Sequence, residues 1–330
     1  MKRLAWIRHV VLLGAGLALA GYIGYYLFER RGEFGRALEL RPEVLALLAG
    51  LVLVGLALRA WQFQMMVRVV GAGISYGRAA QLILAGLVMN LVPLRFGTIM
   101  QAASLKRENQ VRYASFASMH LGEVLVLVMS TGVLGLAGLL FGGAAGRAEA
   151  AVLGGLFAGA IVVSAAVLHT PRAWVDERRT RVHRFLHGVL GGWETLRTAR
   201  RALAVILLAR VAGTLLGVWR LWLAFGSLGV EAGFFRCLIL SAVMQLVLLV
   251  SFTPAGFGLR ELVVAAAAVA TGLAFEQGLF ASTLDHAVAL AVMLLAGVPS
   301  LVLLAARRRR SPGEAEEAGA AEAVPRESGP

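Results

Sequence analysis

The chain has 330 residues and a formal net charge of +13; 59% of its residues are hydrophobic and 15% are charged. Soluble domains carry about 25% charged residues, so this composition excludes an ordinary soluble domain and predicts an all-α polytopic membrane protein. The single cysteine, Cys237, excludes an internal disulfide, and the arginines gather at the ends of apolar runs, where they meet anionic lipid heads rather than nucleic acid.

Six full membrane spans are predicted in chain order. A basic start precedes the first apolar run, which continues past an Ala-Leu-Ala sequence that resembles a signal-peptidase site, so we expect a retained span rather than a cleaved signal. Pro42 suits the first turn of the second span. The predicted spans cover about 10–28, 44–66, 113–141, 148–169, 202–225 and 279–306.

Two further apolar segments are interrupted by proline, glycine and arginine. The first segment, about 79–104, contains the break 90–98, and the second, about 234–275, contains the break 251–261. Irregular backbone survives at membrane depth only where protein or a polar cavity surrounds it, because unpaired N–H and C=O groups find no water in the bilayer core. Such breaks in both halves of a membrane chain are typical of a transport site.

The basic loops favour one of two topologies. If each interrupted segment crossed the membrane once, the basic loop 106–112 would lie outside, against the positive-inside rule. If both segments are re-entrant hairpins that enter from opposite faces, every basic loop is cytoplasmic and the halves form an inverted repeat. We therefore expect two re-entrant hairpins. Eight or more crossings are the alternative, because 234–251 and 256–273 are each long enough to cross.

One membrane domain, 1–306, is expected, with halves at about 10–169 and 202–306. The arginine-rich segment 170–201 joins the halves, either as an interfacial helix on anionic lipid or as a plain linker. Residues 307–330 begin with four arginines that stop the last span and continue as a tail that we predict to be disordered. This distribution of arginine predicts a multi-pass protein of the plasma (inner) membrane with both termini in the cytoplasm.

An arginine follows the proline in each break. At a hairpin tip, the guanidinium of Arg95 or Arg260 and the free N–H groups of a helix end make an anion site, for which a lipid phosphate is the natural ligand. The structural alternative is that each arginine snorkels or pairs with a neighbour, as Arg260 would with Glu261. We include Arg95, Arg260 and Glu261 in the predicted substrate site.

Prolines and glycines shape the two predicted tips. Proline removes a backbone donor and disfavours helix at the residue before it, and glycine then lets the chain turn back without a Cβ clash. The residues with this role are Pro93, Gly97, Pro254, Gly256 and Gly258.

One carboxylate, Glu123, is predicted near the middle of the bilayer. It lies about ten residues, or ~15 Å, into its helix, where a charge should face the bundle interior, be neutral or be paired, and Arg210 is a candidate partner. We place Glu123 and Asn90 in the predicted substrate site. For Asn90, Gln101 and Gln245 the structural alternative is hydrogen bonding between helices.

The two breaks resemble motifs of the flippase-like transmembrane domain of lysylphosphatidylglycerol synthases. That family carries P-x-R-x-G-E in its first half and P-G-G-x-G-x-R-E in its second; here 93–98 read Pro-Leu-Arg-Phe-Gly-Thr and 254–261 read Pro-Ala-Gly-Phe-Gly-Leu-Arg-Glu. The resemblance covers about 10–306. Thr98 and Ala255 depart from the family motifs, and Gly122-Glu123 stands where a Glu-Arg pair is common.

The resemblance implies movement of an amino-acylated or otherwise modified phospholipid between leaflets, and for some members a link to polyprenyl-phosphate glycolipids. Full-length synthases add a soluble aminoacyl-transfer domain, which this sequence does not show, so we do not expect that synthesis from this chain alone.

We therefore expect a lipid translocator that moves an anionic or aminoacylated phospholipid, or a lipid-linked intermediate, between leaflets. The alternative is a membrane-embedded enzyme or accessory subunit acting on phospholipid or polyprenyl-phosphate heads, with Glu123, Asp285 and His286 as its acid–base candidates. Because no catalytic set, metal cluster or phosphate loop is recognisable, we expect no catalytic residues, metal or cofactor. The expected partners are the lipid substrate, anionic membrane lipids, and either a second copy of the chain or a separate lipid-modifying enzyme.

Overall fold

The computed structural model describes residues 41–91, 96–169, 200–250 and 258–322, and within these ranges all regular structure is helical. Five helices are long and apolar enough to cross a membrane, which confirms five predicted spans; the sixth, about 10–28, lies outside the described residues. The long helices are α3 (Pro42–Val69), α6 (Tyr113–Gly142), α7 (Arg147–His169), α9 (Arg200–Ser227) and α12 (Phe275–Glu322). The shorter helices are α4 (Tyr76–Met89), α5 (Phe96–Asn109), α10 (Phe234–Val250) and α11 (Leu259–Ala270).

The first interrupted segment is a re-entrant hairpin whose arms are α4 and α5. An ion pair between Arg78 and Glu108 joins the first turn of α4 to the last turn of α5. Close by, the side-chain amide of Asn109 donates a hydrogen bond to the carbonyl of Gly73 at 3.2 Å. Both arms therefore have their outer ends at one membrane face, the face at which α6 begins.

The second interrupted segment is a hairpin of α10 and α11 at the opposite face. The amide of Ala145, in the turn that follows α6, donates a hydrogen bond to the carbonyl of Ala270 at the end of α11 (2.9 Å). A Cβ on Gly142, the last residue of α6, would lie 2.8 Å from the Cβ of Phe235, at the start of α10. Because one hairpin lies at each end of α6, they enter from opposite faces, as predicted, and the arms are not separate crossings.

Two glycines allow the arms to form beside the breaks. A Cβ on Gly97 would lie 1.8 Å from the carbonyl oxygen of Gly86, so only glycine lets α5 start this close to α4. The amide of Gly97 also donates to Oδ1 of Asn90 at 3.0 Å, which ties the two arms together. Gly258 precedes α11 with a φ of 82°, a left-handed conformation that favours glycine.

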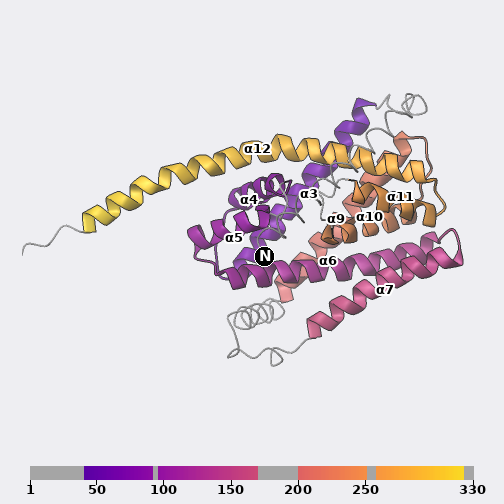
Figure 1. Ribbon diagram of the computed structural model, residues 1–330, viewed down its shortest axis with the longest axis horizontal. Coiled ribbons are helices and arrows are strands. Elements are labelled where there is room, and N and C mark those ends of the chain that lie inside the picture. Colours follow the sequence, from indigo (N-terminus) through magenta and orange to yellow (C-terminus); the bar gives the residue numbers. More distant parts are fainter. Residues whose placement is uncertain (1–40, 92–95, 170–199, 251–257, 323–330) are drawn as a thin grey trace, which may run out of the picture.

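The packing of the helices follows an inverted repeat, which confirms the predicted relation between the halves. In Figure 1, α3 and α9 cross the centre of the bundle, and they are packed against each other and are both 28 residues long. α6 packs on α10 of the second hairpin, and α12 packs in the same way on α4 of the first. Each long helix thus supports the hairpin of the other half, so the halves interlock.

Two hydrophobic cores fill the two ends of the bundle. The first lies at the base of the first hairpin and includes Met66, Leu82, Leu105, Phe116, Ile206 and Leu304; the second lies at the base of the second hairpin and includes Phe157, Leu221, Phe225, Ile239, Val264 and Ala281. Both cores contain residues of α9, one near each end of that helix, and the polar side chains considered next lie between and beside them.

The end of α12 differs from the prediction. The apolar part of the last span ends at Ala306, as predicted. The helix α12 itself continues to Glu322, where a disordered tail was predicted, and it projects beyond the other helices (Figure 1). Alanine, glutamate and arginine dominate the extra turns, and all three are good helix formers, which explains the continuation.

Candidate functional site

The Glu123 cluster, formed by His120, Glu123 and Arg210, lies inside the bundle. One carboxylate oxygen of Glu123 pairs with Nη2 of Arg210, which confirms the predicted partnership between α6 and α9. The other oxygen lies 3.2 Å from Nδ1 of His120, one turn earlier on α6. The side chains of Glu123 and Arg210 are only 15% and 14% exposed, so this charge pair is largely removed from the surface.

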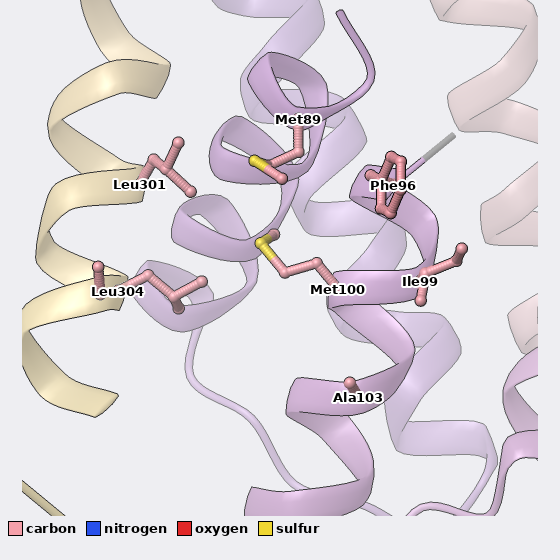
Figure 2. A pocket seen from close by; sticks show the side chains of 8 residues that line it. Met89, Phe96, Ile99, Met100, Ala103, Leu301 and Leu304 are labelled. Atoms are coloured by element: carbon pink, nitrogen blue, oxygen red, sulfur yellow. The ribbon is translucent and has the colours of Figure 1, made fainter. Parts of the chain in front are cut away.

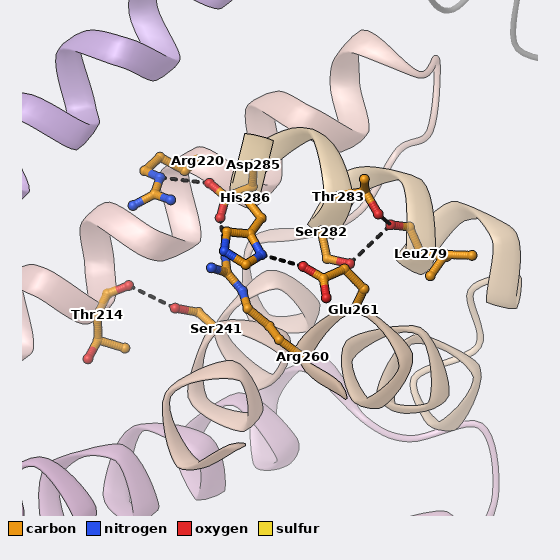
Figure 3. Close-up of polar contacts among 10 residues, drawn as sticks. All are labelled: Thr214, Arg220, Ser241, Arg260, Glu261, Leu279, Ser282, Thr283, Asp285 and His286. Atoms are coloured by element: carbon orange, nitrogen blue, oxygen red, sulfur yellow. Dashed lines mark hydrogen bonds and ion pairs between the residues drawn. The ribbon is translucent and has the colours of Figure 1, made fainter. Parts of the chain in front are cut away.

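The Asp285 cluster is formed by Arg220, Arg260, Glu261, Asp285 and His286, and Figure 3 shows its contacts. Asp285 of α12 is 1% exposed and accepts from two arginines: Nε of Arg220 on α9 at 2.7 Å, and Nη2 of Arg260 on α11 at 2.5 Å. One carboxylate therefore joins three helices.

Within the Asp285 cluster, Glu261 uses both carboxylate oxygens. One accepts a hydrogen bond from the amide of Gly258 at 2.7 Å, which satisfies a free N–H at the start of α11, and the other contacts Nδ1 of His286. Arg260 and Glu261 are neighbours in sequence but turn to different partners, so the alternative in which they pair directly is not what this structure shows.

The charges of the Asp285 cluster balance. Two arginines face two carboxylates, so the charges of the arginines and the carboxylates cancel. A buried charge without a partner is costly, so this balance lets the cluster persist inside the membrane. Among the described residues, nothing accepts a hydrogen bond from the buried Nε of Arg260, so this arginine keeps one unused donor.

Polar contacts lie between the two clusters along α9. Arg210 and Arg220 are ten residues apart, which separates them by about 15 Å along the helix. Between them, the carbonyl of Thr214 accepts from Ser241 at 3.1 Å, and its Oγ1 accepts from Gln245 at 2.7 Å; both donors lie on α10. We call the two clusters with these three residues the polar track.

The remaining predicted site residues lie elsewhere or outside the description. Asn90 caps the end of α4 and binds the other arm, and Gln101 donates across the same hairpin to the carbonyl of Leu82 at 3.2 Å, so both make the interhelical bonds that were the alternative to substrate binding. Arg95, Pro93, Pro254 and Gly256 lie outside the described residues.

Two arginines near the clusters were missed by the sequence analysis as site residues. Arg220 lies well inside the span that was expected at about 202–225, so the criterion that singled out Arg210 also applies to it. Arg59 lies in the second half of α3 and was interpreted only as a charge near the end of that span. The same criterion identifies as a candidate site residue any arginine that lies more than one or two helical turns from the end of its span.

A hydrophobic cavity of about 340 Å³ lies beside the first hairpin, against α12 (Figure 2). It reaches from the tips of both arms toward the base of the hairpin. Its lining residues are Met89, Phe96, Ile99, Met100, Ala103, Leu301, Leu304 and Ala305. In the part of the chain that the structure describes, no three His, Cys, Asp or Glu side chains are grouped so as to hold a metal ion.

Comparison with known proteins places the chain in a family. No curated protein and no solved structure matches it. The family described as the lysylphosphatidylglycerol synthase TM region matches residues 12–297, which is most of the chain and includes both hairpins and the polar track. The chain therefore belongs to the family of the lysylphosphatidylglycerol synthase TM region.

Proposed function

We propose that the protein moves the polar head of an anionic or aminoacylated phospholipid, or of a lipid-linked intermediate, between the leaflets. The observation that carries this proposal is the polar track on α9, where Thr214, Ser241 and Gln245 lie between two charge clusters about 15 Å apart. Charged residues inside membrane spans are costly and usually mark a substrate or ion pathway.

The hairpins explain how such a track can open to both sides. Each hairpin enters from one face and ends inside the bundle, so neither closes the full thickness of the membrane. The Asp285 cluster is built partly on the second hairpin, through Arg260 and Glu261 of α11. A shift of α11 relative to α12 would separate Arg260 from Asp285 and expose both to a polar head, while the acyl chains stay in lipid.

The hydrophobic cavity beside the first hairpin suits an acyl chain. Its lining side chains are hydrocarbons and thioethers from α4, α5 and α12, and it runs along the hairpin from its tip. A lipid chain seated there would bring its head toward the bundle interior, which is what a translocator requires.

We propose further that the face of the first hairpin's base is cytoplasmic in the plasma membrane. Lys106 and Arg107 in the last turn of α5, and Arg112 just before α6, lie at this face, and α9 starts there with Arg200 and Arg201. Both termini then lie in the cytoplasm, and any separate lipid-modifying enzyme would meet the protein at this face.

An enzyme acting on lipid heads is the second candidate, and the contact between Glu261 and His286 favours it. A carboxylate that orients an imidazole is a common arrangement in general acid–base catalysis. The translocator is preferred because both oxygens of Glu261 are bound by the protein and His286 is only 6% exposed.

A leaflet-resolved assay tests both candidates together. Purified protein is reconstituted into liposomes that contain phosphatidylglycerol with a fluorescent acyl chain, and dithionite added outside quenches the outer label only. If the protein is a translocator, dithionite quenches nearly all of the label. Mass spectrometry should then show that the lipid is chemically unchanged. Protection of half the label, as in protein-free liposomes, contradicts translocation, and a chemically altered lipid indicates the enzyme.

A further inference from the structure

Arg59 lies on the buried face of a membrane span and is nevertheless exposed. At 100° per residue, Val52, Phe63 and Met66 lie within about 40° of it around the axis of α3, and all three are buried. Leu53 and Val54, on the other side of the helix, are exposed, as expected for lipid contact. Arg59 is therefore an exposed residue on the side of α3 that otherwise packs into the bundle.

Arg59 lies beside Arg210 of the Glu123 cluster. α3 packs against α9, with the Cβ position of Gly55 3.9 Å from the side chain of Leu216, and the positive charges of Arg59 and Arg210 interact. Arg59 has no hydrogen bond or ion pair within the described ranges of the chain. The two arginines thus lie close together, although only Arg210 is paired with a carboxylate.

The charges here do not balance, in contrast to the Asp285 cluster. Glu123 pairs with Arg210, and no carboxylate of the described residues pairs with Arg59, so the two arginines carry an excess of one positive charge when His120 is neutral. In addition, the buried Nε of Arg210 has no hydrogen-bond acceptor among the described residues, because Glu123 binds Nη2. An uncompensated charge and an unused donor inside a membrane require an anion from elsewhere.

We infer that Arg59 and Arg210 form a seat for the phosphate of a lipid head, with Nε of Arg210 and the guanidinium of Arg59 donating to its oxygens. This inference rests on the proposed translocation and assigns a place to the head along the polar track. Arg59 lies about 5 Å from the middle of α3, toward the base of the first hairpin. The proposed phosphate site is therefore closer to that membrane face than the Asp285 cluster is.

A phosphodiester fits this seat in charge and shape. It carries one negative charge, which together with Glu123 neutralises the two arginines. Its oxygens match the fork of a guanidinium, which binds phosphate through two parallel hydrogen bonds. Glu123 binds Nη2 of Arg210 and leaves Nε without an acceptor among the described residues, so Nε is available to the ligand.

Binding is measured on protein purified in dodecyl maltoside, which contains no phosphate. Three probes are compared: dihexanoylphosphatidylglycerol, inorganic phosphate, and dihexanoylglycerol, which lacks phosphate. Binding to the folded state raises the unfolding temperature, and the rise grows with the logarithm of the ligand concentration divided by its Kd. We expect a rise with the phospholipid, little with inorganic phosphate and none with dihexanoylglycerol. Inorganic phosphate that binds as tightly as the phospholipid would mean a free-anion site and overturn the inference.

The Arg59→Gln variant then tests the seat itself. We expect its affinity for dihexanoylphosphatidylglycerol to fall roughly 10- to 100-fold, the effect of losing charge-assisted hydrogen bonds. Its unfolding temperature without lipid should be unchanged or higher, because Arg59 makes no bond in the described structure. Arg59→Lys keeps the charge without the fork and should bind with intermediate affinity. The matched control is Arg68→Gln, an exposed arginine at the end of α3, which should bind as wild type.

Two outcomes separate this inference from the proposed function. If the wild type moves lipid and Arg59→Gln keeps both wild-type affinity and rate, the seat is wrong and translocation stands. If the wild type moves no lipid but Arg59→Gln still loses affinity, the seat stands and translocation is wrong.

Discussion

At the scale of single residues, Asp285 is the centre of the polar interior. It accepts from Arg220 and Arg260 and so holds α9, α11 and α12 together, at a position where it is 1% exposed. Such a cluster resists opening only as long as its charges stay paired. A polar head with a phosphate offers the arginines an alternative partner, which is how a substrate can compete with the internal ion pairs.

The Arg260→Ala variant should abolish translocation without unfolding the protein. Asp285 keeps Arg220 as its partner, so removing Arg260 leaves no carboxylate unpaired. Arg260→Lys should recover only part of the rate, because lysine is a point charge and lacks the planar fork. The leaflet-resolved assay and the unfolding temperature measure both effects.

The control is Arg78→Ala, which removes the ion pair at the base of the first hairpin. A well-folded Arg260→Ala protein that moves lipid at the wild-type rate would contradict a role of Arg260 in translocation.

The buried charged residues were easier to predict from the sequence than the partners that they bind. The depth of Glu123 in its span was enough to predict a buried pair with Arg210, and the structure confirms it. The partner of Arg260 could not be predicted, because Asp285 lies 25 residues away and the contact depends on how α11 packs against α12. Because Glu261 is next to Arg260 in the sequence, it was the suggested partner, but Glu261 instead caps the start of α11.

At the scale of elements, the two hairpins are the features that carry the fold. Their arms are short, 14 residues in α4 and 17 in α10, and each pair returns to the face from which it started. The proline and glycine breaks predicted this arrangement from sequence, since they end a helix at a depth where lipid-exposed loops are forbidden. The end of α12 was not predictable in the same way, because a run of arginines marks a membrane boundary but does not end a helix.

Gly97→Ala tests whether the first hairpin needs the close approach of its arms. A Cβ at this position would meet backbone of α4 at 1.8 Å, so the arms must separate, and we expect a loss of about 1–3 kcal/mol, the usual cost of overpacking. Thermal unfolding in detergent measures it. Gly155→Ala in α7 is the matched control: a Cβ there meets nothing within 4 Å, so it should be neutral or stabilising. Equal stability of the two variants would show that the arms are not in close contact.

At the scale of the whole molecule, the inverted repeat relates the two halves. α6 packs against the second hairpin and α12 against the first, so each half is in contact with the hairpin of the other. The sequence predicted the repeat from the two breaks and the basic loops alone. It could not predict that α3 and α9 pack together at the centre, which brings Arg59 beside Arg210, since that contact joins residues about 150 positions apart.

The opposite orientation of the hairpins predicts how cysteines react from the two sides of the membrane. Single cysteines are introduced into a Cys237→Ser protein by Gly73→Cys, at the base of the first hairpin, or Ala274→Cys, at the base of the second. Both positions are exposed. We expect an impermeant maleimide added to intact cells to label Ala274→Cys only, and to label Gly73→Cys after the cells are opened. Labelling of both from outside would place the two hairpins at one face and contradict the inverted repeat.

The central claim is that polar heads cross along α9, and the translocation rate of a Thr214→Val, Gln245→Leu double variant tests it most directly. These changes remove two of the three polar side chains between the clusters, leave Ser241 on its backbone acceptor, and keep the ion pairs of both clusters in place. We predict a translocation rate at least about tenfold below wild type, from the loss of roughly 1.4 kcal/mol or more of polar stabilisation for the crossing head. The unfolding temperature should stay close to wild type, and Ser164→Ala, which removes a buried hydroxyl from α7, should leave the rate unchanged. A well-folded double variant that moves lipid at the wild-type rate would contradict the account.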